Sequence, residues 1–213
     1  MMDAEFSFDE WVQYIFDNPG GDDSWRFHLD PPLVSDSVQL DYLTRLFENA
    51  SSVLTPYSDA QVNNGLWFIG GSALGIVEVL FDEGLAWGRR EQCIRAMYGL
   101  YADIFAKRCS PHLSHLDEPG ANPLNSICYM WWDLLPILWY EAPFYPVGFE
   151  VMRDTLQLDS IACQEGALHG LGHLAFYRED EVAAVIDQFL EQHPNIRPEL
   201  RTYALAARSG CIL

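Results

Sequence analysis

The chain has 213 residues, 49% hydrophobic and 14% aromatic, and its 31 acidic against 12 basic residues give a net charge of −19. This hydrophobic content excludes a disordered chain, and the length is ample for a core within one domain. The acidic excess disfavours nucleic acid and anionic membranes as partners and favours a basic protein. Simple solubility explains the same excess equally well.

The chain contains five widely spaced cysteines: Cys93, Cys109, Cys128, Cys163 and Cys211. Their odd number and the lack of a C-x-x-C pair argue against a disulfide framework and a structural zinc site, and for a reducing compartment. The acidic start, Met-Met-Asp-Ala-Glu, does not resemble a signal peptide, and the most apolar run, 127–140, is too short to span a bilayer. We therefore expect a cytoplasmic protein without a membrane segment.

Helix signals begin near the N-terminus. Two capping boxes, Ser7-Phe-Asp-Glu10 and Ser58-Asp-Ala-Gln61, each predict the start of a helix, because the serine and the third residue after it satisfy each other's backbone N–H groups. Apolar spacing predicts further helices over about 37–49 and 89–108. Residues 73–81 fit a helix or a strand, and a helix is favoured because no partner strand is visible. Residues 1–35 are expected to form a loosely packed helix and loop.

The second half continues the helical pattern. The signals predict an aromatic-rich helix after Asn122-Pro123, a helix over about 147–156, a glycine-bearing helix capped by Asp159 or Ser160, one over 178–192, and a last one from Pro198 to Ser209-Gly210. The strong periods are near 3.6, and no Asn-Gly or Asp-Gly hairpin appears. The sequence therefore predicts one all-α domain over 1–213.

The glycine-bearing helix, over about 161–176, is the most informative stretch. Gly166, Gly170 and Gly172 lie inside it, although a glycine in a helix interior costs about 1 kcal/mol relative to alanine. The economical explanation is close approach, since bare backbone lets another helix or a ligand come nearer than a side chain permits. We expect this helix to lie inside a helical stack.

Three helices share a pair of a small and a large residue: Ala96-Met97, Ala167-Leu168 and Ala204-Leu205. With Gly170 and the segment 197–205, this pattern resembles HEAT-like helical repeats, best over residues 160–209. The resemblance implies a right-handed α-α superhelix of nested helix pairs, although the period is short and the aromatic middle departs from the repeat. An irregular multi-helix bundle is the alternative. Through Ser58-Asp-Ala-Gln-Val62 and Ala167-Leu-His-Gly-Leu-Gly-His173, the chain also resembles small acidic bacterial proteins of unknown function, which implies no activity.

Glu165, His169 and His173 lie four apart on one face of the glycine-bearing helix. Two of them can share a metal ion, but the outer two are about 12 Å apart along the axis, so a site needs ligands from elsewhere, such as Asp133, His112 or His115. The H-E-x-x-H pattern is absent. The interpretation we favour is a pair of histidines that hydrogen-bond to a neighbouring helix, without metal or cofactor.

Trp131 and Trp132 are adjacent, and neighbours on a helix diverge by about 100°. We therefore expect one of them at a boundary, beside Asp133, where tryptophan is suited to recognition. The alternative is an extended core in which a tryptophan covers a gap between helices. No nucleophile elbow, P-loop or dinucleotide fingerprint is present, so no catalytic residue is assigned.

The leading hypothesis is a non-enzymatic protein-binding module with an acidic, aromatic-rimmed surface, in its specific form an immunity-type inhibitor of a basic toxin. Its expected binding residues are Trp131, Trp132, Asp133, Glu165, His169 and His173. The first alternative is a metal-dependent hydrolase that uses the Glu165, His169 and His173 face. The second alternative is a structural homodimer.

Overall fold

The computed structural model describes residues 6–22, 24–28, 32–71, 76–135 and 142–212. Over these residues the chain is helical and contains no strand, which confirms the all-α class. The chain divides into two compact units, residues 1–100 (unit 1) and 101–213 (unit 2). That both belong to a single domain stays a prediction. Among the described residues, no helix is both long enough and apolar enough to cross a membrane.

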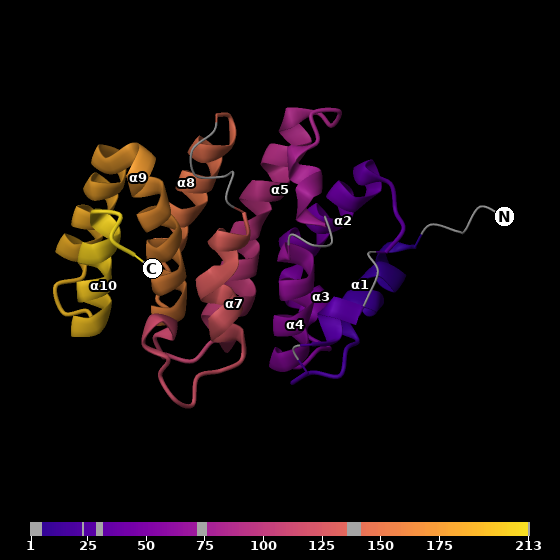
Figure 1. The fold of residues 1–213 in the computed structure, drawn as a ribbon, viewed down its shortest axis with the longest axis horizontal. Coiled ribbons are helices and arrows are strands. Elements are labelled where there is room, and N and C mark those ends of the chain that lie inside the picture. The colour runs from indigo at the N-terminus through magenta and orange to yellow at the C-terminus, as the bar shows by residue number, and fades with distance from the viewer. Residues whose placement is uncertain (1–5, 23, 29–31, 72–75, 136–141, 213) are drawn as a thin grey trace. The chain divides into compact units, whose positions relative to one another are not determined.

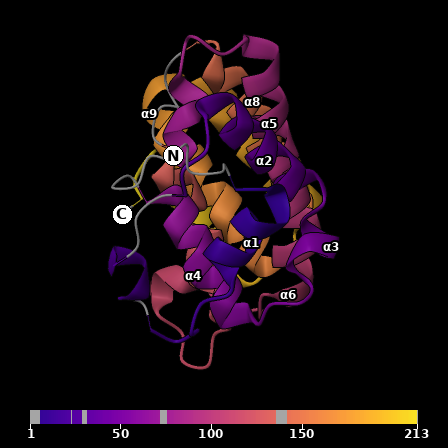
Figure 2. The same ribbon diagram turned by 90° about the vertical axis from the view of Figure 1, so that its right-hand side faces the viewer.

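The described residues of unit 1 form five α-helices: α1 (Phe8–Phe16), α2 (Asp36–Glu48), α3 (Ala50–Leu54), α4 (Asp59–Gly70) and α5 (Trp87–Leu100). Short 3-10 segments occupy Trp25–His28 and Val77–Phe81. Helix α1 packs on α4, and α2 packs on α5 (Figure 2). Both predicted capping boxes are formed, at Ser7 and at Ser58. Of the predicted helix over 73–81, residues 73–75 lie outside the described residues and the rest is largely a 3-10 helix.

The N-terminal helix is packed tightly, so the expectation of loose packing over 1–35 is wrong for α1. Trp11, Ile15 and Phe16 are fully buried. The loop after α1 is also tied to α4, because the Asn18 side-chain amide donates to the carbonyl of Gln61 at 3.0 Å and the Gln61 amide donates back to the carbonyl of Asn18 at 3.0 Å. The apolar spacing after Ser7 describes a core helix rather than an appended one.

Unit 2 begins with a π-helical turn, Tyr101–Phe105, and α6 (Ala106–Arg108). Its remaining α-helices are α7 (Leu124–Met130), α8 (Phe144–Leu156), α9 (Ile161–Gln192) and α10 (Pro198–Arg208), and 3-10 turns occupy Ser114–Leu116 and Trp131–Leu134. Helices α7, α8 and α10 all pack against α9 (Figure 1). Helix α9 is therefore the central element of this unit.

The glycines of α9 allow the close approach that the sequence predicts. A Cβ atom at Gly166 would lie 2.4 Å from the backbone carbonyl oxygen of Cys128 in α7, and one at Gly170 would lie 2.5 Å from Sδ of Met152 in α8. At Gly172, a Cβ atom would lie 2.7 Å from Cδ1 of Ile212. Two neighbouring helices and the C-terminal segment thus contact bare α9 backbone, and a side chain at any of these positions would force its neighbour to move.

Most predicted helix boundaries in unit 2 are confirmed. Ser160, not Asp159, caps α9, and Pro198 begins α10, which ends before Gly210 in the left-handed conformation. The helices predicted over about 161–176 and 178–192 are one element, with a kink at Arg178, where φ is −141° and ψ is 49°. The end of the aromatic-rich segment, with Trp139 and Tyr140, lies outside the described residues.

Candidate functional site

Three side chains from two segments meet beside α9. Asp133 comes from the 3-10 turn after α7, and His169 and His173 lie one turn apart on α9. Asp133 Oδ1 accepts from Nε2 of His173 at 2.6 Å, its Oδ2 lies 3.1 Å from Nε2 of His169, and the two Nε2 atoms are 3.3 Å apart. One candidate ligand atom from each residue lies within 4.8 Å of the other two. We call these three residues the His–Asp cluster.

The cluster joins a buried and a solvent-accessible group. His169 is buried, while the side chains of Asp133 and His173 are 25% and 30% exposed. Partial burial raises the pKa of the Asp133 carboxyl, but hydrogen bonds and positive charge from His169 and His173 outweigh it and hold that pKa well below its usual range. Asp133 is therefore an anion at neutral pH.

Two tyrosine hydroxyls lie on the Nδ1 side of the buried His169 ring. The hydroxyl of Tyr203, on α10, lies 2.6 Å from Nδ1 of His169 and 3.0 Å from the hydroxyl of Tyr129 on α7. Burial raises the pKa of both tyrosines, so the two hydroxyls are neutral. The far side of the His169 ring is thus fixed by neutral hydrogen-bonding groups, and its Nε2 points to Asp133.

Glu165 lies on the same helix but has a different role from the cluster. Its fully buried carboxylate accepts from the backbone N–H groups of Ser114 and His115, at 2.9 and 3.0 Å, and from Nδ1 of His115 at 2.6 Å. The His115 ring stacks on Tyr203 at 4.2 Å. Glu165 therefore fastens the loop before α7 to α9. The hydrolase alternative loses one of its three named residues.

Trp131 and Trp132 are both fully buried, so the expected boundary position of one of them is wrong. The 100° argument assumes a continuing α-helix, whereas α7 ends at Met130 and the two tryptophans form a 3-10 turn. Trp132 lies under α9, where its Cγ would be 2.7 Å from a Cβ at Gly170, and it stacks on Tyr101 at 6.0 Å. The extended-core alternative describes this pair.

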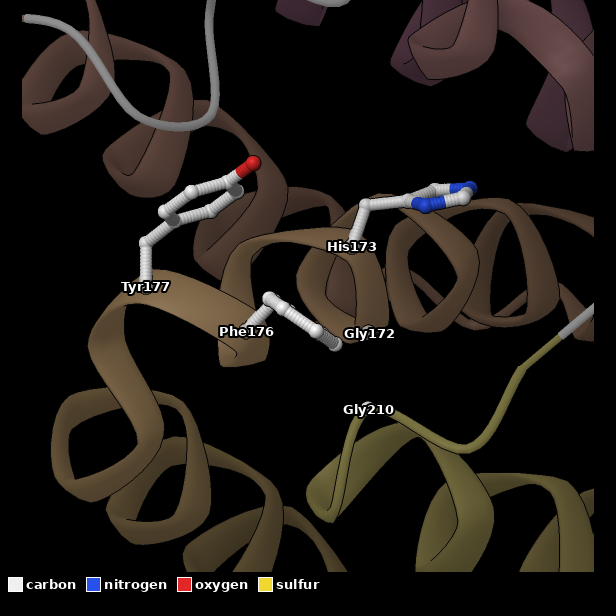
Figure 3. Close-up of a pocket in the computed structure, with 5 residues that line it drawn as sticks. All are labelled: Gly172, His173, Phe176, Tyr177 and Gly210. Atoms are coloured by element: carbon white, nitrogen blue, oxygen red, sulfur yellow. The ribbon is translucent and has the colours of Figure 1, made fainter.

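Among the described residues of unit 2, the exposed aromatic side chains lie instead at the kink of α9. Phe176 and Tyr177 are 84% and 53% exposed, and three exposed acidic residues, Glu179, Asp180 and Glu181, follow them. We call these five residues the kink patch. Phe176 and Tyr177 also line a pocket of about 300 Å³, together with Gly172, His173 and Gly210 (Figure 3). The sequence contains a signal for this surface: the adjacent aromatic residues Phe176 and Tyr177 come after the apolar part of the helix and before the acidic run 179–181.

The loop before α7 is also tied to α10 by an ion pair, which gives a pH-dependent prediction. Hydrogen bonds from Arg197 and from the backbone N–H of Leu113 lower the pKa of Glu118 from 4.5 to about 2. Because this pKa is below its unfolded value, the pair's stabilisation is complete above about pH 4.5 and is lost as the pH falls toward 2.

Urea unfolding of the wild type and of Glu118→Gln, at about pH 6 and about pH 3, measures this contribution. We expect the difference in free energy of unfolding between the two proteins to shrink at the lower pH. A difference that stays constant between the two pH values would show that the ion pair is not its source.

Comparison of the chain with protein-family models, with curated proteins and with solved structures gave no match. The HEAT-like resemblance therefore stays a prediction. Of its three residue pairs, Ala167 and Leu168 are fully buried, as are Met97 and Ala204, whereas Leu205 is exposed. The described residues form an all-α protein in which α9 carries both histidines of the His–Asp cluster and the exposed aromatic and acidic residues of the kink patch.

Proposed function

We propose that the chain is a non-enzymatic protein-binding module whose contact surface is the kink patch, and that its partner is a basic protein. The observation that carries the proposal is an exposed aromatic pair followed, after Arg178, by three exposed acidic residues. In its specific form the proposal is an immunity-type inhibitor that covers a basic toxin. HEAT-like nesting of the helices would supply the rigid scaffold for such a surface.

The aromatic pair has the character of an interface anchor. Phe176 and Tyr177 form an exposed apolar patch rather than a single exposed side chain, and aromatic residues are enriched where binding energy concentrates. The two rings lie 5.9 Å apart beside the pocket of about 300 Å³, so a partner side chain can pack against both the rings and the pocket (Figure 3). This arrangement replaces Trp131 and Trp132 as the aromatic part of the proposed surface.

The charge around the pair favours a basic partner. Glu179, Asp180 and Glu181 are exposed, and the whole chain carries a net charge of −19. The neighbouring cation, Arg178, places its guanidinium 4.2 Å from the centre of the Tyr145 ring. Opposite charge steers association and suppresses wrong partners, so binding should weaken as salt rises.

The double variant Phe176→Ala/Tyr177→Ala is expected to bind the partner at least about tenfold more weakly, because losing one aromatic anchor commonly costs 2 kcal/mol or more. The tagged wild type, this variant and the matched variant Phe27→Ala, which removes an exposed aromatic of unit 1, are used to capture partners from the source cell. Affinity for the captured protein is then measured between about 50 and 500 mM salt.

The proposal requires a basic protein whose binding falls with salt and with the double variant, but not with Phe27→Ala. A partner that binds the double variant as well as the wild type would contradict the assigned surface. The homodimer alternative gives a different result: sedimentation would show a species of twice 24.3 kDa that the double variant converts to a monomer.

A further inference from the structure

We infer that Asp133, His169 and His173 bind a divalent first-row transition-metal ion, for which Zn²⁺ is the probe. This inference does not depend on the proposed protein partner. It departs from the interpretation favoured by the sequence, in which the histidines only hydrogen-bond to a neighbouring helix. Two imidazole nitrogens and one carboxylate form a ligand set that zinc and non-haem iron sites use in proteins.

The spacing of the three ligand atoms fits one ion. Two ligands at 2.0–2.1 Å from a tetrahedral zinc ion lie about 3.3–3.4 Å apart. The two Nε2 atoms are 3.3 Å apart, and the Asp133 oxygens are 3.1 and 2.6 Å from them. The 3.1 Å distance must lengthen by about 0.2 Å and the 2.6 Å distance by about 0.7 Å when an ion takes the place of the hydrogen-bonding protons.

The chemistry of the cluster also favours a cation. The two Nε2 atoms lie 3.3 Å apart and each can donate to an Asp133 oxygen, whereas a neutral histidine with its hydrogen on Nδ1 turns an Nε2 lone pair into the cluster. Tyr203 supplies an acceptor for that tautomer, because its hydroxyl oxygen lies 2.6 Å from Nδ1 of His169, and a ring that donates Nδ1–H to it keeps Nε2 free. A hydrogen bond on the far ring nitrogen is the usual support of a metal-binding histidine.

The site can be reached and is not closed by the protein. His169 is buried, but Asp133 and His173 are partly exposed, and His173 also lines the pocket beside Phe176 (Figure 3). Three protein ligands leave a fourth position for solvent, as in zinc sites that are not purely structural. An ion would therefore enter from the His173 side.

Calorimetric titration of the chelator-treated full chain with Zn²⁺ tests the inference. We expect one ion per chain, and at least about 100-fold weaker binding in Asp133→Asn, which keeps the shape of the side chain, and in His173→Ala. Tyr203→Phe should weaken binding about 10- to 100-fold through loss of the Nδ1 partner. His193→Ala, a substitution at the far end of α9, should bind as the wild type does.

The five cysteines are present in every variant, so binding to thiols would survive in Asp133→Asn. Equal Zn²⁺ affinity of Asp133→Asn and the wild type, or no binding by the wild type, would overturn the inference. Circular dichroism shows whether the variants remain folded, and visible absorption of bound Co²⁺ gives a second measure of the ligand set. Phe176→Ala/Tyr177→Ala should leave Zn²⁺ binding unchanged, so failure of one proposal does not imply failure of the other.

Discussion

The Gly166→Ala variant should be less stable than the wild type by about 2–3 kcal/mol. The added methyl group would lie 2.4 Å from the carbonyl oxygen of Cys128 and 3.3 Å from its carbonyl carbon, so α7 and α9 must move apart. Both contacts are with backbone, which yields less readily than a flexible side chain, so the cost should lie at or above the upper end of the about 1–3 kcal/mol that overpacking typically costs. The higher helix propensity of alanine recovers only about 1 kcal/mol. Urea unfolding followed by circular dichroism measures the difference.

Gly88→Ala is the matched control, with the opposite expected sign. Gly88 is an exposed residue of α5, and a Cβ atom there would have no neighbour within 4 Å. Alanine should therefore stabilise by up to about 1 kcal/mol. Stabilisation by Gly166→Ala of the same size as that by Gly88→Ala would show that α7 does not contact the backbone of α9.

The Glu165→Leu variant should lose about 3–5 kcal/mol of stability. Leucine has a similar volume but accepts no hydrogen bond, so the N–H groups of Ser114 and His115 and the His115 ring nitrogen lose their acceptor. An unsatisfied buried N–H costs about 1–3 kcal/mol, and removal of one partner of a buried charged pair costs about 3–5 kcal/mol. Thermal and urea unfolding both measure this loss.

Glu191→Leu, at an exposed position of the same helix, provides the control and should change stability by no more than about 0.5 kcal/mol. Glu165→Gln separates shape from hydrogen bonding. Its side chain has the same shape, but the amide replaces one acceptor oxygen with an NH2 group, which would face the N–H groups that now donate to Glu165. It should also destabilise the protein. A Glu165→Leu variant as stable as Glu191→Leu would contradict the claim that Glu165 stabilises the fold by hydrogen bonds to the loop before α7.

Local signals in the sequence predict much of this fold. Ser7 and Ser58 mark true helix starts, because a capping box satisfies backbone groups that have no partner within the helix. The three glycines of α9 predict close contact without saying which element makes it, since their helix-propensity cost requires a compensating reason. Propensity and periodicity act over a few residues, so they identify the helices but not which helices pack against each other.

The site depends on contacts between distant segments, so the sequence predicts it only in part. His169 and His173 are visible as a pair, and Asp133 is one of several candidate partners, but no periodicity tells which of them reaches α9. The partner of Glu165 is a loop about 50 residues away, which no local pattern reveals. The error at Trp131 and Trp132 has a local cause, because α7 ends at Met130 and the two tryptophans form a 3-10 turn, which changes the directions of their side chains.

The central claim is that residues 161–175 of α9 form the structural centre of unit 2, with α7, α8 and α10 packed on their backbone and side chains. Native-state hydrogen exchange tests it most directly, because it measures the free energy of opening at each amide. The amides of 165–175 should exchange last in this unit, and only through its complete unfolding. Exchange of these amides as fast as that of the exposed segment 179–181 would contradict the claim.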